Sequence, residues 1–122
     1  MAYRISNFVK DLDLRVVTGV YTDHDLLHGC CCDMLSWVMS RLDPETCWFT
    51  ILNSMNVVAV AHLSECPCVV LTENVQMSDS VLAKAREEHI CICSSPDTTY
   101  DAAVKLAGFL SAAKGSANEN IV

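Results

Sequence analysis

The chain has 122 residues, of which 52% are hydrophobic and 19% charged, enough for one domain with a buried core. Its 8 Lys and Arg residues against 15 Asp and Glu residues give a formal net charge of −7. This balance disfavours nucleic acid and membrane surfaces as partners, because both are negatively charged. No basic segment followed by a long apolar run opens the sequence, so we expect a cytosolic protein without a membrane span.

The first half of the chain predicts short elements separated by polar turns. Apolar residues at helical spacing indicate helices, and short β-branched runs indicate strands. Asp and Ser next to such a helical pattern are favoured N-caps. The expected elements are a helix over residues 5–12 capped by Ser6, a strand over 15–18, a strand near 26–27, and a helix over 33–42 capped by Asp33.

The second half alternates more regularly between strands and helices. The expected strands cover residues 47–52, 68–71 and 90–93, and the expected helices cover 55–65, 78–88 and 98–110. Such alternation predicts a three-layer α/β fold, with a mostly parallel sheet and helices on both of its faces. We expect a single domain over residues 1–113 and a disordered tail over 114–122, which is small and polar.

Polar residues gather where three of the predicted strands meet the helices that follow. Ligands of open α/β sheets bind beyond the carboxyl ends of the strands, where free backbone N–H groups can hold a phosphate or carboxylate. Ordinary helix capping is the other interpretation of each junction, because these residue types are the favoured caps. The candidate ligand-binding residues are Asp33, Ser36, Asn53, Asn56, Ser94, Ser95 and Thr98.

The cysteines are expected to be thiols or ligands, since the cytosol keeps disulfides reduced. Cys30, Cys31 and Cys32 precede a predicted helix N-terminus, which favours thiolates and makes the triplet a candidate metal site, for instance across a dimer. His24 and His28 could add nitrogen ligands. The spacing matches neither zinc ribbons nor common iron–sulfur motifs, so the sequence names no cofactor.

Three further cysteines and one tryptophan are expected to serve packing. Cys68, Cys91 and Cys93 fall within predicted strands, where free cysteine behaves as a small hydrophobe. Trp48 is expected in the core, and Trp37 is expected to be partly exposed at an interface.

Enzyme motifs are missing from the sequence. Four glycines are too few for a phosphate-binding loop or a dinucleotide fingerprint, and no nucleophile elbow or His-Glu-x-x-His motif occurs. A thiol or phosphotransfer enzyme is therefore the weakest interpretation, and we expect no catalysis.

Residues 33–39 read Asp-Met-Leu-Ser-Trp-Val-Met, which resembles the Asp-Leu-Leu-Ser-x-Val-Met signature of small stand-alone DRTGG-domain proteins. Residues 56–61, residues 83–90 and the stretch Ser94-Ser95-Pro96 with Tyr100 fit the same pattern, so the resemblance covers about residues 5–110. It implies a fold like the N-terminal domain of HPr kinase/phosphorylase. Such proteins are often labelled predicted serine kinases of the HPr protein, an activity that is not carried over to a chain without a phosphate-binding loop.

The resemblance also implies a regulatory or dimerising role. Where many relatives have Asp-Arg and a Gly-Gly pair, this chain has Asp23-His24 and His28-Gly29, and Cys32 stands at a common glycine position. These departures argue against an inherited phosphate site in that loop. The leading hypothesis is a homodimeric module that senses a small anion or docks onto a partner enzyme or redox protein. The alternative is a metal or iron–sulfur redox protein that uses Cys30–Cys32.

Overall fold

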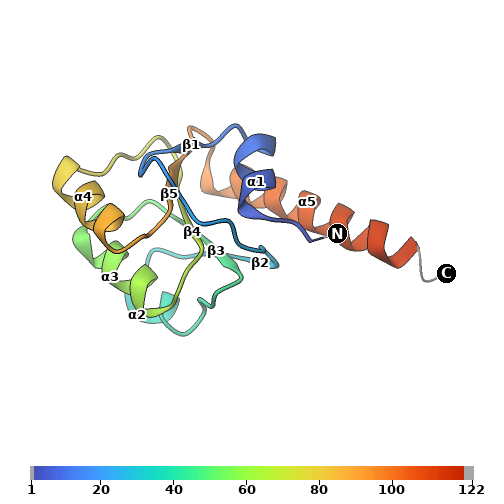
Figure 1. The fold of residues 1–122 in the computed structure, drawn as a ribbon, viewed down its shortest axis with the longest axis horizontal. Coiled ribbons are helices and arrows are strands. Elements are labelled where there is room, and N and C mark those ends of the chain that lie inside the picture. Colours follow the sequence, from blue (N-terminus) through green and yellow to red (C-terminus); the bar gives the residue numbers. More distant parts are fainter. Residues whose placement is uncertain (1, 120–122) are drawn as a thin grey trace.

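The structure is a computed structural model that describes the backbone of residues 2–119 and the side chains of residues 2–114. Five strands and five helices follow one another along the chain (Figure 1). Within the described residues, no helix is long and apolar enough to cross a membrane. The elements are α1 (Ile5–Asp11), β1 (Arg15–Val16), β2 (His28–Cys31), α2 (Leu35–Val38), β3 (Thr46–Thr50), α3 (Met55–Leu63), β4 (Cys68–Leu71), α4 (Asp79–Glu87), β5 (Ile92–Ser94) and α5 (Thr99–Glu119).

The strands form one mixed sheet in the order β1-β5-β4-β3-β2. Strands β2 to β5 run parallel, with Trp48 opposite Val69 and Val69 opposite Ile92. Strand β1 pairs antiparallel with β5, where Arg15 lies opposite Ser94. The predicted mostly parallel α/β sheet is therefore confirmed, with β1 as an antiparallel edge.

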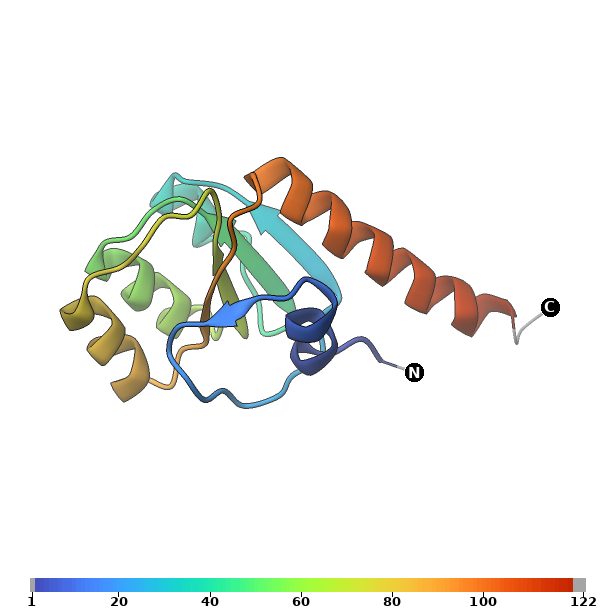
Figure 2. The same cartoon turned by 90° about the horizontal axis from the view of Figure 1, so that it is seen from above.

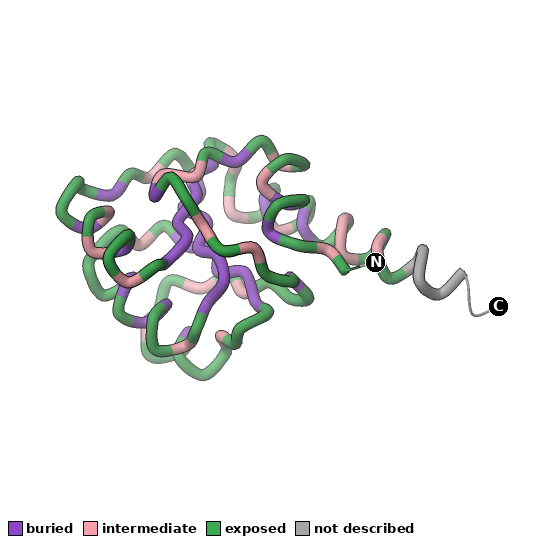
Figure 3. Tube along the Cα trace, in the orientation of Figure 1, coloured by how far each residue is buried: buried purple, intermediate pink, exposed green. Residues whose placement is uncertain are grey.

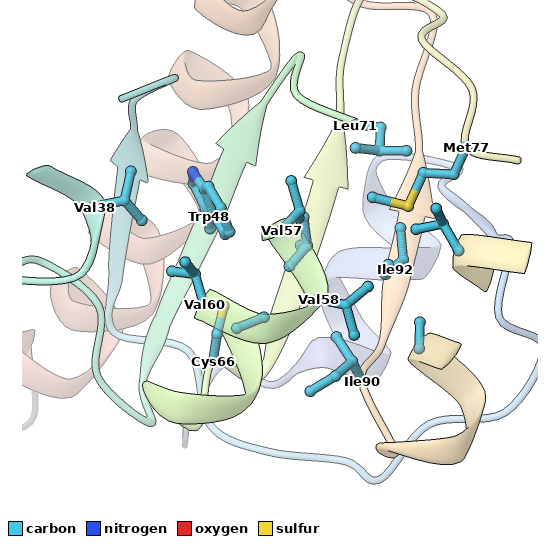
Figure 4. Packing of buried hydrophobic residues seen from close by; sticks show 14 residues of the cluster. Val38, Trp48, Val57, Val58, Val60, Cys66, Leu71, Met77, Ile90 and Ile92 are labelled. Carbon is cyan, nitrogen blue, oxygen red and sulfur yellow. The ribbon is translucent and has the colours of Figure 1, made fainter. Parts of the chain in front are cut away.

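Helices cover both faces of this sheet, which gives the predicted three layers (Figure 2). Successive side chains of a strand point to opposite faces, so each central strand serves two cores. Trp48 and Ile92 face α2, α3 and α4, in the cluster shown in Figure 4. Phe49 and Val70 face α1 and α5. The central strands are consequently buried along their length, whereas the helices keep exposed outer faces (Figure 3).

Most of the predicted elements are confirmed, and β4 has the predicted bounds. Strand β2 lies two residues later than expected, because Leu26 is buried and its N–H donates to the Tyr3 carbonyl at 2.8 Å. Helix α5 extends to Glu119, past the predicted end at residue 110. The predicted disordered tail over 114–122 falls partly outside the described residues and stays a prediction.

Neither predicted cap of the first half caps its helix. Asn7 Oδ1 accepts the Arg4 N–H at 3.0 Å at the start of α1, while Ser6 donates from N and Oγ to the Asp23 carboxylate at 2.9 and 2.7 Å. Burial raises the pKa of Asp23, but the hydrogen bonds from Ser6 and the nearby Arg4 outweigh it and lower that pKa. Met34, and not Asp33, occupies the N-cap position of the four-residue helix α2.

Candidate functional site

A cavity of about 330 Å³ lies at the carboxyl ends of β4 and β5. Arg15 from β1 and Arg86 from α4 both line it. Ser94, at the end of β5, and Gln76, in the loop between β4 and α4, add polar groups. Asp79, at the start of α4, is the acidic residue of the lining. The fold thus brings two guanidinium groups to the edge of the sheet where α/β proteins bind ligands.

Backbone carbonyls hold the Arg86 side chain in place. Its Nε donates to the Thr18 carbonyl at 3.3 Å and its Nη2 to the Val17 carbonyl at 3.2 Å. The Thr18 hydroxyl in turn accepts the Ile92 N–H at 3.1 Å, which ties this segment to β5. Among the described residues, no ion pair holds Arg15 or Arg86. Both guanidinium groups therefore retain donors for an anion.

The structure brings only one of the predicted ligand-binding residues, Ser94, to this cavity. Asn53 does not line the cavity, but its Nδ2 donates to the carbonyl of the lining residue Gln76 at 2.9 Å. Ser95 is buried, and its Oγ accepts the Asp97 N–H at 3.1 Å. Thr98 Oγ1 accepts the Asp101 N–H at 3.1 Å, in the first turn of α5. Thr98 therefore serves the helix-capping role that the sequence left open. Ser95 instead stabilises the turn that precedes α5.

The other three predicted residues lie toward the β2 side of the sheet. Asp33 Oδ1 accepts the Thr50 hydroxyl at 2.7 Å and the Ile51 N–H at 3.0 Å, so it joins the end of β2 to the end of β3. Ser36 and Asn56 are exposed on α2 and α3 and do not line the cavity. The predicted ligand-binding residues are therefore divided between the β4–β5 side and the β2 side of the sheet.

The cysteine triplet does not converge on one point within the chain. Cys30 and Cys31 are successive residues of β2, so their side chains face opposite sides of the sheet. The Cys32 sulfur accepts the Met34 N–H at 3.5 Å. Burial raises the pKa of Cys30 and of Cys31. The helix N-terminus that was predicted to favour thiolates does not lie directly beside Cys30 and Cys31, because α2 begins only at Leu35.

A different group of cysteines does converge. The Sγ atom of Cys93 lies 3.8 Å from that of Cys68 and 3.9 Å from that of Cys91. Hydrogen bonds from Cys68 and Cys93 lower the pKa of Cys91 well below its usual range. Sequence reasoning assigned these thiols to packing, although the Cys-x-Cys spacing on one strand already placed Cys91 and Cys93 on one face. It missed Arg15 and Arg86 altogether.

Comparisons with known proteins place this geometry in a family. The family model described as the DRTGG domain matches residues 7–109. A solved structure with a TM-score of 0.60 and 10% sequence identity contains the CBS and DRTGG domains of the regulatory region of Clostridium perfringens pyrophosphatase, complexed with its activator diadenosine tetraphosphate. The match covers 80% of this chain and 43% of that chain, so this chain spans less than half of that regulatory region. No curated protein matches. On the family match, this chain belongs to the DRTGG domain family.

Proposed function

We propose that this DRTGG-domain protein is a non-catalytic regulatory module that binds a small phosphate-bearing anion through Arg15 and Arg86. The observation that carries this proposal is the convergence of both guanidinium groups on one cavity. They are two of only eight Lys and Arg residues in a chain of net charge −7. A positively charged cavity on an acidic protein favours an anionic ligand over a cationic one.

The size and rigidity of the cavity fit such a ligand. Its volume of about 330 Å³ is at the small end of the range for ligand sites, which suits a phosphate group with part of a nucleoside. A charge-assisted hydrogen bond from a guanidinium group contributes about 1.5–3 kcal/mol. Because the Val17 and Thr18 carbonyls already orient Arg86, little side-chain entropy remains to be lost on binding.

The regulatory part of the proposal is supported by the family. The solved DRTGG domain belongs to the regulatory region of an enzyme, and that region was captured with a dinucleoside polyphosphate activator. By analogy, we expect the ligand of this chain to carry phosphate and its effect to be exerted on another protein.

Calorimetric titration of the full chain with inorganic pyrophosphate, ATP and diadenosine tetraphosphate tests the anion site. We expect Arg15→Gln to weaken the affinity for the best of these ligands about tenfold, the equivalent of one lost charge-assisted contact of about 1.4 kcal/mol. Arg41→Gln is the matched control, because Arg41 lies over the Trp37 ring on α2, 4.5 Å from its centroid. The absence of binding by all three ligands, or equal affinities of the two variants, would contradict the proposal.

Self-association is a further part of the proposed function. Trp37 is 54% exposed, and the exposed Met34 and Met39 flank it around α2. Aromatic residues and methionine are enriched at interfaces, so we propose that this patch pairs two copies of the chain. Sedimentation velocity over a range of concentrations should show a dimer that Trp37→Ser converts to a monomer. Tyr100→Ser, at an exposed aromatic on α5, should leave the dimer intact. A wild-type chain that is monomeric at every concentration would contradict this.

Docking onto a partner enzyme is the alternative role for the same patch. It is supported by the place of the solved DRTGG domain within the regulatory region of an enzyme. An enzyme subunit that co-purifies with the wild-type chain but not with Trp37→Ser would favour docking over self-association.

Metal or iron–sulfur binding by Cys30–Cys32 is the second candidate function. The observation in its favour is that β2 is an edge strand, where two chains could bring their triplets together. Stoichiometric iron and sulfide in anaerobically purified protein, lost on changing all three cysteines to serine, would favour it. Colourless, iron-free protein would remove it.

A further inference from the structure

Three buried thiols from two neighbouring parallel strands converge on the face of the sheet covered by α1 and α5. Cys68 lies in β4, Cys91 immediately precedes β5, and Cys93 is its middle residue. The last two are two positions apart and so lie on one face. Cys68 and Cys93 are fully buried, and Cys91 is 4% exposed. Among the described residues, this is the one group of three potential metal ligands whose donor atoms all lie within 4.8 Å of one another.

The sulfur separations match those of thiolates around one metal ion. A metal–sulfur bond of about 2.3 Å places ligand sulfurs about 3.8 Å apart in a tetrahedral site and about 4.0 Å apart in a trigonal one. The observed separations from Cys93 are 3.8 and 3.9 Å. A disulfide would instead require two sulfurs to approach to about 2.05 Å. Two of the three sulfur separations therefore match those around one metal ion, and the third, between Cys68 and Cys91, is within 4.8 Å.

A second cavity gives the cluster a route to solvent. It has a volume of about 410 Å³ and lies at the amino ends of β4 and β5, the opposite end of the sheet from the anion cavity. Cys91 lines it together with His24, His62 and His89. Imidazole nitrogens bind soft cations transiently, so they can guide an ion to the Cys91 sulfur, and thiol protons can leave by the same path.

We propose that Cys68, Cys91 and Cys93 form a buried three-thiolate site for a soft metal cation, with Cu(I) as the ion that suits three sulfur ligands. Thiolates select Cu(I) and Zn(II) over hard cations. Three sulfurs lie within 4.8 Å of one another, which suits trigonal Cu(I), while the thiol of Cys47 on β3 lies beside Cys68 outside that group. On binding, S–H bonds break, Cu–S bonds form and the protons pass to solvent, with no change in oxidation state. The site is independent of the proposed anion site, because it uses other residues, on the face of the sheet covered by α1 and α5.

Anaerobic titration of the reduced full chain with Cu(I), against a chromophoric Cu(I) chelator, tests this site. We expect one equivalent to be bound, with a thiolate-to-copper absorption band in the ultraviolet. Removing an outer-shell partner of a metal site typically costs 10–100-fold in affinity, so removing a ligand should cost about 100-fold or more. We therefore expect Cys93→Ser, which removes the sulfur shared by both short contacts, to weaken binding by at least that factor.

Cys93→Ala is the second variant, in case burial of the serine hydroxyl prevents Cys93→Ser from folding. A small apolar side chain avoids that cost in the core. The matched control changes Cys30, Cys31 and Cys32 together to serine, and it should still bind one equivalent of Cu(I). A parallel titration with Zn(II) identifies the preferred ion. If the wild type binds Zn(II) and Cys93→Ala does not, the three-thiolate site is upheld with Zn(II) as its ion. The proposal is overturned if the wild-type chain takes neither ion from its chelator. It is also overturned if folded Cys93→Ala binds the metal as tightly as the wild type does, or if only the triplet variant loses the metal.

Discussion

Replacing Trp48 with alanine is expected to lower the free energy of unfolding by about 3–5 kcal/mol, as for other large buried aromatic residues. Trp48 is fully buried in β3, between Val38 and Val57 in the cluster (Figure 4). Its indole Nε1 also donates to the Cys32 carbonyl at 2.9 Å. The truncation therefore combines a cavity with the loss of a hydrogen bond that holds the segment after β2.

Trp37 provides the control for this experiment, because it is the other tryptophan and is 54% exposed. In protein dilute enough for the proposed dimer to be dissociated, Trp37→Ala should cost no more than about 1 kcal/mol, chiefly the contact with the Arg41 guanidinium. Urea unfolding followed by circular dichroism gives both values without relying on tryptophan fluorescence. Similar losses in the two variants would show that Trp48 is not the centre of the core.

Leu106→Ala is expected to cost about 2–5 kcal/mol, the usual range for a buried leucine. Leu106 is 1% exposed and attaches α5 to the sheet. A side chain on Gly29 would have its Cβ 3.4 Å from Leu106 Cδ2 and 3.4 Å from the Phe49 ring, which shows how closely α5 approaches β2. Leu106 fills the space beside Gly29, so shortening it to alanine leaves a cavity between α5 and β2.

The effect should be concentrated in α5. Hydrogen exchange of the α5 amides is expected to accelerate more than that of β4, because the helix is anchored chiefly by Ala102 and Leu106. Val104→Ala is the control two positions away, where the side chain is 51% exposed and the change should stay within about 0.5 kcal/mol. A loss at Val104 equal to that at Leu106 would mean that α5 packs through another face.

The elements that were predictable from sequence are those in which local pattern and tertiary environment agree. Strand β4 is a continuous apolar run bounded by Pro67 and Thr72, which is the expected pattern for a strand buried on both faces. Ser78 both precedes α4 and accepts the Val81 N–H at 3.4 Å, so the cap chemistry marks the boundary correctly.

Long-range contacts decided the elements that were misplaced. Asp33 is a suitable N-cap, but its carboxylate accepts hydrogen bonds from the end of β3 instead. Ser6 is similarly engaged by Asp23, which lies seventeen positions along the chain. The Gly-Cys-Cys sequence of β2 has little strand propensity, and its pairing with β3 supplies the missing preference.

The candidate site was less predictable than the fold. The rule that ligands bind at the carboxyl ends of strands led to Ser94, but it gave no reason to select Arg15 and Arg86 among the eight cationic residues. Those two residues meet only because β1 joins the sheet beside β5 and α4 packs behind it. The same reasoning placed Cys68, Cys91 and Cys93 in strands without showing that β4 and β5 are neighbours.

The antiparallel pairing of β1 with β5 has a consequence for the order in which the protein is made. Arg15 leaves the ribosome early, but its partner Ser94 is synthesised about 80 residues later, a long-range contact of the kind that slows folding. Strands β2 to β4 can pair while synthesis continues, and α1 can pack on Phe49 in β3, whereas β1 must wait for β5. A nascent chain that stalls before β5 therefore leaves β1 unpaired, which makes that strand the natural target for chaperones and proteases.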